Sequence, residues 1–112
     1  MRMKDATEIP INVRQRVYDR DSWDGAPCCI ICGKPYPQVH HYVERSRGGL
    51  GIEENLVCLC ASCHGKADGP QRTLIANHIR QYLMNKYPNW DESKLVKEKT
   101  YGPYKDWNDN QE

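Results

Sequence analysis

Several things are scarce in this sequence of 112 residues. It contains no Phe, apolar residues make up only 38% of it, and its mean hydropathy is −0.86. A chain this short and polar buries little apolar area, so its hydrophobic core alone would leave it marginally stable. We therefore expect one small domain over residues 1–112, stabilised by something besides its core.

Long apolar runs are also absent. No stretch approaches the length needed to cross a membrane, and the charged N-terminus lacks the apolar segment of a secretory signal. These absences predict a cytoplasmic protein with no membrane partner. Because thiols stay reduced in the cytoplasm, the six cysteines are expected to bind metal rather than to form disulfides.

Charge of one sign hardly predominates, since the formal net charge is +1, and the total does not demand a nucleic-acid partner. The distribution of charge points more clearly to such a partner. Arg14, Arg16 and Arg20 recur in the first segment, and Arg45 and Arg47 lie close together near the middle of the chain. Such clusters can contact phosphates. A solvated helix face explains any single one of these residues equally well.

Apolar periodicity predicts two longer helices. Residues 11–20 place Val13 and Val17 at helical spacing, with Ile11 and Tyr18 beside them. Residues 73–87 form a second amphipathic pattern, ended by Pro88. The apolar face of this second helix is predicted to contain Leu74, Ile75, His78, Ile79, Tyr82 and Leu83.

Shorter elements are predicted between these helices. Residues 39–44 and 56–59 suit extended strands, and residues 60–66 suit a short helix. Residues 1–8 are predicted to be a frayed terminus. Residues 89–112 are interpreted as a polar tail held on the domain by scattered aromatic side chains, with disorder as the alternative.

Four of the six cysteines form two C-x-x-C units, Cys29 with Cys32 and Cys60 with Cys63. Each unit places two thiolates on a tight turn, and two units complete the closed tetrahedral site of a structural zinc. The 27 residues between the units exceed what a simple zinc ribbon needs, so further structure is expected there. Such a zinc says little about function, because nucleases, transcription factors and adaptor domains all use one.

Cys28 and Cys58 fall outside this spacing. We interpret both as small, at least partly buried apolar residues. Redox or metal sensing through either thiol is the alternative.

The segment between and after the cysteine pairs closely resembles the HNH endonuclease family over about residues 28–66. The features that carry the resemblance, besides the two C-x-x-C units, are the doublet His40-His41, the loop Arg45-Ser46-Arg47-Gly48-Gly49, the pair Asn55-Leu56 and the terminus Cys63-His64. The resemblance implies a small α+β, metal-stabilised fold. Its expected architecture is a ββα-metal (HNH) core with flanking helices and a structural zinc knuckle pair.

The resemblance also implies roles for individual residues. His41 matches the general base, His64 matches a ligand of the catalytic metal, and Asn55 matches the central Asn that positions the base or touches the metal. His40 stands where many members have a metal-binding Asp. Arg45 is interpreted as a contact to the scissile phosphate or the DNA backbone.

Two consequences follow for the histidine doublet. Imidazole favours Mn²⁺ and other borderline cations over Mg²⁺, so activity with Mn²⁺ is expected to equal or exceed that with Mg²⁺. Adjacent residues on a regular strand face opposite ways. His40 and His41 can therefore serve one site only if the strand ends or twists at this point.

The sequence therefore predicts a metal-dependent endonuclease that hydrolyses DNA phosphodiester bonds with little sequence specificity of its own. Its cofactors would be one structural Zn²⁺ and a catalytic Mn²⁺, Mg²⁺ or other divalent cation, and its partner would be DNA, bound through the backbone. The alternative is a zinc-stabilised module that binds nucleic acid without cutting it. The sequence does not choose between monomer and dimer, or among roles in phage packaging, restriction and mobile elements.

Overall fold

The computed structural model describes residues 6–96. The helices and strands are α1 (Ile11–Arg20), β1 (Ser22–Trp23), β2 (Ala26–Pro27), β3 (Gln38–His41), β4 (Leu56–Leu59), α2 (Ala61–Ala67) and α3 (Arg72–Lys86). Three 3-10 helices, Arg45–Arg47, Glu53–Asn55 and Glu92–Leu95, lie in the connections. The fold is a small α+β arrangement with two antiparallel strand pairs, β1–β2 and β3–β4.

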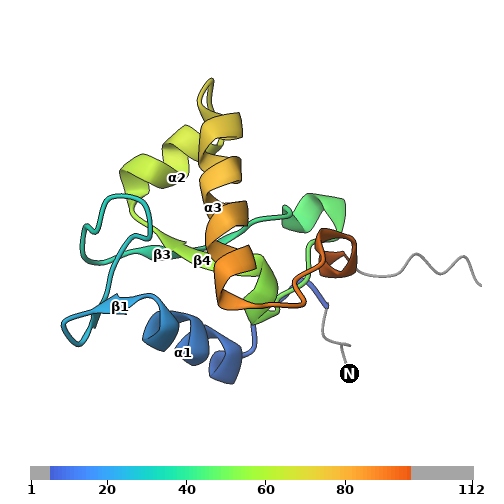
Figure 1. Ribbon diagram of the computed structural model, residues 1–112, viewed down its shortest axis with the longest axis horizontal. Coiled ribbons are helices and arrows are strands. Elements are labelled where there is room, and N and C mark those ends of the chain that lie inside the picture. Colours follow the sequence, from blue (N-terminus) through green and yellow to red (C-terminus); the bar gives the residue numbers. More distant parts are fainter. Residues whose placement is uncertain (1–5, 97–112) are drawn as a thin grey trace, which may run out of the picture.

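Strand β4 is the centre of the molecule, and Figure 1 shows the β3–β4 pair between α1 on one side and α2 on the other. Every residue of β4 is buried. Successive side chains on a strand point to opposite faces, so β4 separates two apolar clusters. Val57 and Leu59 pack with the α3 side chains, whereas Leu56 and Cys58 pack with α1.

The elements predicted from the sequence are largely confirmed. The helix over 11–20 and the strand over 56–59 match α1 and β4, and the second long helix begins and ends one residue earlier than predicted. The strand predicted over 39–44 is shorter, because it pairs regularly with β4 only through His41. Beyond that point the chain turns into the 3-10 helix Arg45–Arg47.

The predicted apolar faces are correct in their centres and wrong at their edges. Helix α3 is buried through Ile75, Ile79 and Leu83, which are spaced four residues apart. This narrow stripe leaves Leu74 70% exposed. On α1, Ile11 is likewise 86% exposed, so only Val13 and Val17 of the predicted face are buried.

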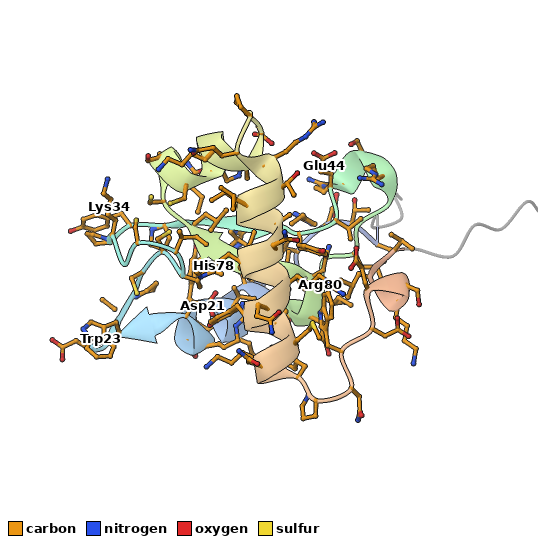
Figure 2. All side chains as sticks on the ribbon, turned by 45° about the horizontal axis from the view of Figure 1, so that its top comes forward. Asp21, Trp23, Lys34, Glu44, His78 and Arg80 are labelled. Atoms are coloured by element: carbon orange, nitrogen blue, oxygen red, sulfur yellow. The ribbon has the colours of Figure 1, made fainter. Side chains whose placement is uncertain are left out.

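A buried ion pair between Arg20 and Asp21 connects the end of α1 to the rest of the fold. Arg20 donates through Nε and Nη2 to the two carboxylate oxygens of Asp21, at 2.7 and 2.9 Å. The same carboxylate accepts hydrogen bonds from the Tyr82 hydroxyl and from the backbone N–H of Cys58. Figure 2 shows Asp21 beside α3 and Trp23, which is 79% exposed, at the edge of the molecule. The group therefore links α1, β4 and α3.

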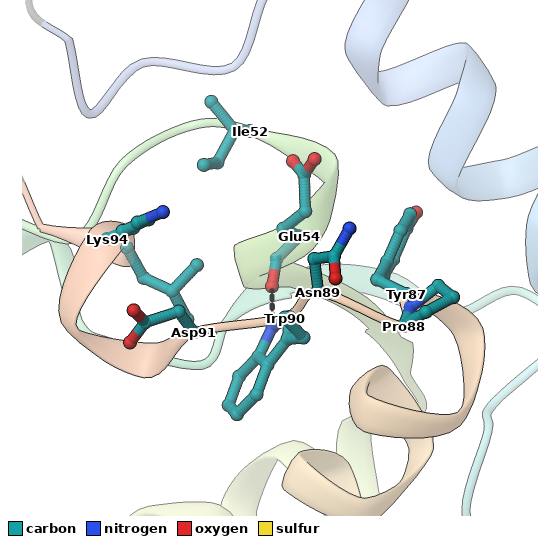
Figure 3. A pocket seen from close by; sticks show the side chains of 9 residues that line it. Ile52, Glu54, Tyr87, Pro88, Asn89, Trp90, Asp91 and Lys94 are labelled. Carbon is teal, nitrogen blue, oxygen red and sulfur yellow. Dashed lines mark hydrogen bonds between the residues drawn. The ribbon is translucent and has the colours of Figure 1, made fainter.

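The C-terminal part of the described chain packs against the core. The Trp90 indole N–H donates to the carbonyl oxygen of Glu54 at 2.8 Å, as Figure 3 shows. Leu95 is 2% exposed. This packing confirms the predicted wrapping for residues 89–96; residues 97–112, with Tyr101, Tyr104 and Trp107, lie outside the described residues.

The N-terminal prediction is wrong where the structure can test it. Residues 6–8 are not frayed: the Gly51 N–H donates to the Ala6 carbonyl oxygen at 3.0 Å, and Thr7 is only 3% exposed. Within residues 6–96, no helix combines the length and apolar character needed to cross a membrane.

Candidate active site and metal centres

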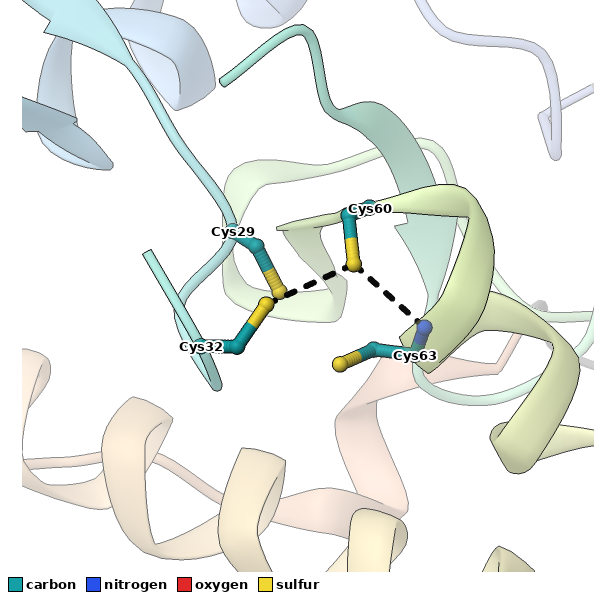
Figure 4. Close-up of side chains that lie close together, drawn as sticks. All are labelled: Cys29, Cys32, Cys60 and Cys63. Carbon is teal, nitrogen blue, oxygen red and sulfur yellow. Dashed lines mark hydrogen bonds between the residues drawn. The ribbon is translucent and has the colours of Figure 1, made fainter. Parts of the chain in front are cut away.

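The two C-x-x-C units converge on one point, as Figure 4 shows. The sulfur atoms of Cys29, Cys32, Cys60 and Cys63 all lie within 4.8 Å of one another, and the Sγ atoms of Cys32 and Cys60 are 3.5 Å apart. Four sulfurs at 2.3 Å from a tetrahedral zinc would be roughly 3.8 Å apart. The donor set and its spacing therefore suit a structural zinc, as the sequence predicts.

The backbone around these cysteines favours thiolates. The Ile31 N–H donates to Cys29 Sγ and the Cys63 N–H to Cys60 Sγ, each at 3.4 Å. Burial opposes the Cys29 thiolate, but backbone N–H groups outweigh burial and lower its pKa. The Cys63 N–H lowers the pKa of Cys60 to about 6.

Four crowded sulfurs cannot all carry charge without a counter-ion. Burial, reinforced by the three neighbouring thiols, raises the pKa of Cys63 to about 12. A bound divalent cation removes this conflict, because each ligand then binds as a thiolate.

The other two cysteines lie outside the four-cysteine group. Cys58 is fully buried on the α1 side of β4, and its pKa is raised to about 12, chiefly by burial and then by Asp21. Cys28 is half-buried, and its thiol donates to the Asp21 carbonyl oxygen at 3.6 Å. Neither residue contributes a ligand to the cluster.

Two histidine side chains of a type that can bind a metal lie next to the four-cysteine group. His40, on β3, and His64, on α2, meet edge to face with ring centroids 4.8 Å apart. His40 Nδ1 and His64 Nε2 are 3.4 Å apart. Helix α2 begins at the second cysteine pair, with Cys60 as its N-cap, so the fold around the four-cysteine group places His64 opposite β3.

The geometry of this pair fits a shared cation. Two imidazole nitrogens bound at 2.0–2.1 Å to one tetrahedral ion would be roughly 3.4 Å apart. Burial, and then proximity to His64, lower the pKa of His40 to about 4, so its ring is neutral, as a ligand must be. The other nitrogen of His64, Nδ1, lies 3.9 Å from a carboxylate oxygen of Asp68. A carboxylate behind a metal-binding imidazole commonly orients the ring.

The second histidine of the doublet takes a different direction. His41 Nε2 lies 2.9 Å from the carbonyl oxygen of Thr7, in the N-terminal segment. Burial is the main cause that lowers the pKa of His41, and the charges of Arg45 and Arg14 lower it further. The structure therefore brings His40 to His64 and turns His41 toward Thr7, at the point where the regular strand ends.

Arg45 and Asn55 flank His41 in different ways. The Arg45 Nε donates to the Thr7 hydroxyl at 3.2 Å. Asn55 is fully buried and bonds to backbone: its Oδ1 accepts from the Val43 N–H, and its Nδ2 donates to the carbonyl oxygens of Val43 and Leu50. Asn55 thus fixes the chain that follows the doublet. The side-chain bonds that the structure gives it reach neither predicted metal ligand.

A cleft of about 270 Å³ adjoins His40. Its lining includes two arginines, Arg47 and Arg72, and two carboxylates, Glu44 and Asp68. Of the arginine cluster predicted on α1, only part is available to contact phosphates. Arg20 is held by Asp21, and Arg16 donates to Glu53 at 3.2 Å.

Two neighbours of the predicted site were not found from the sequence. Asp68 follows His64 by four residues on or next to α2, a spacing that puts side chains on one helix face and could have indicated it. Nothing in the sequence around Thr7 indicates its contact with His41, because 34 residues separate the two.

Comparisons with known proteins agree with this geometry. The family model of the HNH endonucleases matches residues 29–69. Over 39 residues, the chain is 44% identical to the type IV methyl-directed restriction enzyme EcoKMcrA of Escherichia coli (strain K12). That match covers 35% of this chain and 14% of the restriction enzyme.

Proposed function

We propose, from the premise that residues 29–69 match the family model of the HNH endonucleases, that this protein is a metal-dependent endonuclease that hydrolyses DNA phosphodiester bonds. Because the match spans only 14% of EcoKMcrA, the proposed function does not include the methyl-directed restriction for which that enzyme is named. The observation that carries the proposal is the convergence of His40 Nδ1 and His64 Nε2, 3.4 Å apart, beside the four-cysteine group.

His40 and His64 would hold the catalytic cation. A divalent cation there would neutralise the negative charge that grows on the phosphate and on the leaving oxygen. Two imidazole ligands favour Mn²⁺ and other borderline ions over Mg²⁺. Asp68, whose carboxylate lies 3.9 Å from His64 Nδ1, would orient the ring for binding once it came within hydrogen-bond distance.

His41 would act as the general base. It would take a proton from the attacking water, whose oxygen forms a bond to phosphorus as the bond from phosphorus to a bridging oxygen breaks. The lowered pKa keeps His41 neutral near pH 7 and ready to accept that proton.

The proposed base and the proposed metal ligands would together place the phosphate at the end of β3. β3 ends at His41, so a phosphate at this end of the strand would have His40 on one side and His41 on the other. Arg45, next to His41, would contact the same phosphate or a neighbouring one. Arg47 and Arg72, which line the cleft, would bind the DNA backbone.

The test is relaxation of supercoiled plasmid DNA by the purified protein with Mg²⁺, Mn²⁺, Ni²⁺ or Zn²⁺. Wild-type protein is expected to nick the plasmid, at least as fast with Mn²⁺ as with Mg²⁺. His41→Ala should be about 10²–10⁴-fold slower. His78→Ala, which removes an exposed imidazole from α3, should cut at the wild-type rate.

Two results would count against the proposal. Zinc-loaded wild-type protein that binds DNA but leaves the plasmid supercoiled with every cation would favour the binding-module alternative. Nicking by His41→Ala at the wild-type rate would remove His41 from the role of base.

A further inference from the structure

The N-terminal segment, residues 6–9, lies outside the part of the chain that matches the HNH family, yet it reaches the predicted base. His41 Nε2 is 2.9 Å from the Thr7 carbonyl oxygen. A carbonyl oxygen only accepts hydrogen bonds, so His41 Nε2 must carry the proton. A neutral imidazole holds a single N–H, and Nδ1 is therefore left with the free electron pair.

The same residue also contacts the arginine beside the base. The Thr7 hydroxyl accepts from Arg45 Nε at 3.2 Å. Thr7 is 3% exposed, so this contact and the contact to His41 are made in the interior. One residue thus meets two predicted site residues through two different groups, its backbone carbonyl and its side chain.

The path of the segment is fixed by a close approach to Gly51. The Gly51 N–H donates to the Ala6 carbonyl oxygen at 3.0 Å. A Cβ at position 51 would lie 2.0 Å from the Glu8 carbonyl oxygen, a distance that no side chain tolerates. Because both groups are backbone, any side chain at position 51 would push residues 6–9 away.

We propose that residues 6–9 complete the active site by holding His41 in its Nε2–H tautomer, so that Nδ1 is the nitrogen that accepts the proton, and by positioning Arg45. Thr7 is a positioning residue in this scheme, and its catalytic consequence rests on the proposed nuclease function. The matched family segment would then be incomplete without residues that precede its first residue by 20 to 23 positions in the sequence.

The test compares Gly51→Ala with Gly69→Ala. At position 69 an added Cβ would make only an ordinary contact, 3.5 Å from the Gly65 carbonyl oxygen, so Gly69→Ala is a matched control. The tautomer of His41 is read from the ¹⁵N chemical shifts of its two ring nitrogens in NMR spectra. The sample is protein that carries zinc at the four cysteines, with no second divalent cation added. Nicking kinetics supply kcat and KM for the same variants.

Wild type and Gly69→Ala should show His41 protonated at Nε2, and Gly51→Ala should show a mixture of tautomers. Gly51→Ala should have a roughly 10–100-fold lower kcat, with KM nearly unchanged. A Thr7→Val variant keeps the backbone carbonyl but loses the hydroxyl, so it should keep the tautomer and raise KM through Arg45. Thr7→Ser should restore the wild-type KM.

The proposal would be overturned by a wild-type His41 protonated at Nδ1, or by a folded Gly51→Ala protein with the wild-type tautomer and kcat. If Gly51→Ala does not fold, the tautomer of wild-type His41 and the KM difference between Thr7→Val and Thr7→Ser still decide the matter. A protein that cuts no DNA but shows the tautomer change in Gly51→Ala would refute the nuclease function while supporting the positioning by residues 6–9.

Discussion

Replacing Asp21 by Asn is expected to destabilise the fold severely, although the two side chains have nearly the same shape. The Asp21 side chain is fully buried. It accepts two hydrogen bonds from Arg20, one from the Cys58 N–H and one from the Tyr82 hydroxyl. An amide at this position leaves the Arg20 guanidinium, whose side chain is 12% exposed, without its counter-charge and turns an N–H₂ group toward a donor.

Breaking one side of a buried ion pair costs about 3–5 kcal/mol. Domains are stable by only about 5–15 kcal/mol, so Asp21→Asn would remove a large share of the total. At about 4 °C per kcal/mol for a chain of this size, Tm should fall by roughly 12–20 °C. Circular dichroism during heating, at a fixed zinc concentration, measures the change.

Asp19→Asn is the control, because Asp19 is exposed and its carboxylate accepts a hydrogen bond from Gln15 on the same helix. This change should alter stability by less than about 0.5 kcal/mol. If Asp21→Asn lowered stability no more than Asp19→Asn, the buried ion pair would not be what fastens α1 to β4 and α3.

Three further outcomes are expected. Cys63→Ser should unfold the domain and lose zinc, because the free energy of zinc binding contributes directly to folding. Ser62→Ala, the neighbouring change on α2, should keep one zinc per chain. Equal zinc contents of the two variants by elemental analysis would contradict this. Leu83→Ala should cost about 2–5 kcal/mol in urea unfolding, and Met84→Ala, which truncates a side chain that is 41% exposed, should cost much less. Arg47→Gln should weaken DNA binding equally for all sequences, and the slope of the logarithm of the binding constant against the logarithm of the salt concentration should fall by about one. Fluorescence anisotropy at several salt concentrations measures both effects. An unchanged slope would show that Arg47 does not contact the DNA backbone.

Much of the fold could be predicted because local patterns determine it. The C-x-x-C spacing indicated the ligands of the four-cysteine group, and their convergence is confirmed. The helix over 11–20 was predicted from Val13 and Val17, which are the buried residues of α1. In both cases the information lies within a few residues of sequence.

The site could be predicted only in part, because long-range packing decides the direction of each side chain. The sequence indicated His40 and His64 as a ligand pair, and the structure brings their nitrogens to 3.4 Å. It did not indicate that His41 would bond to Thr7, since Asn55 was the residue expected either to position the base or to touch the metal. That side chain instead binds the backbone at Val43 and Leu50.

The arginines show the same limit. Arg20, like Arg14 and Arg16, was predicted either to contact phosphates or to lie on a solvated helix face, but it lies in the interior with Asp21. Sequence spacing places all three on one helix and cannot show which of them finds a carboxylate from another element.

Titration of the zinc-loaded protein with Mn²⁺, followed by the EPR signal of free Mn²⁺, tests most directly whether the four-cysteine scaffold presents His40 and His64 to a second, exchangeable cation. Wild type and His78→Ala should each bind one Mn²⁺ per chain while keeping one zinc, and His64→Ala should lose the Mn²⁺ but retain the zinc. Binding of Mn²⁺ by His64→Ala with wild-type affinity, or release of zinc as Mn²⁺ binds, would contradict the account.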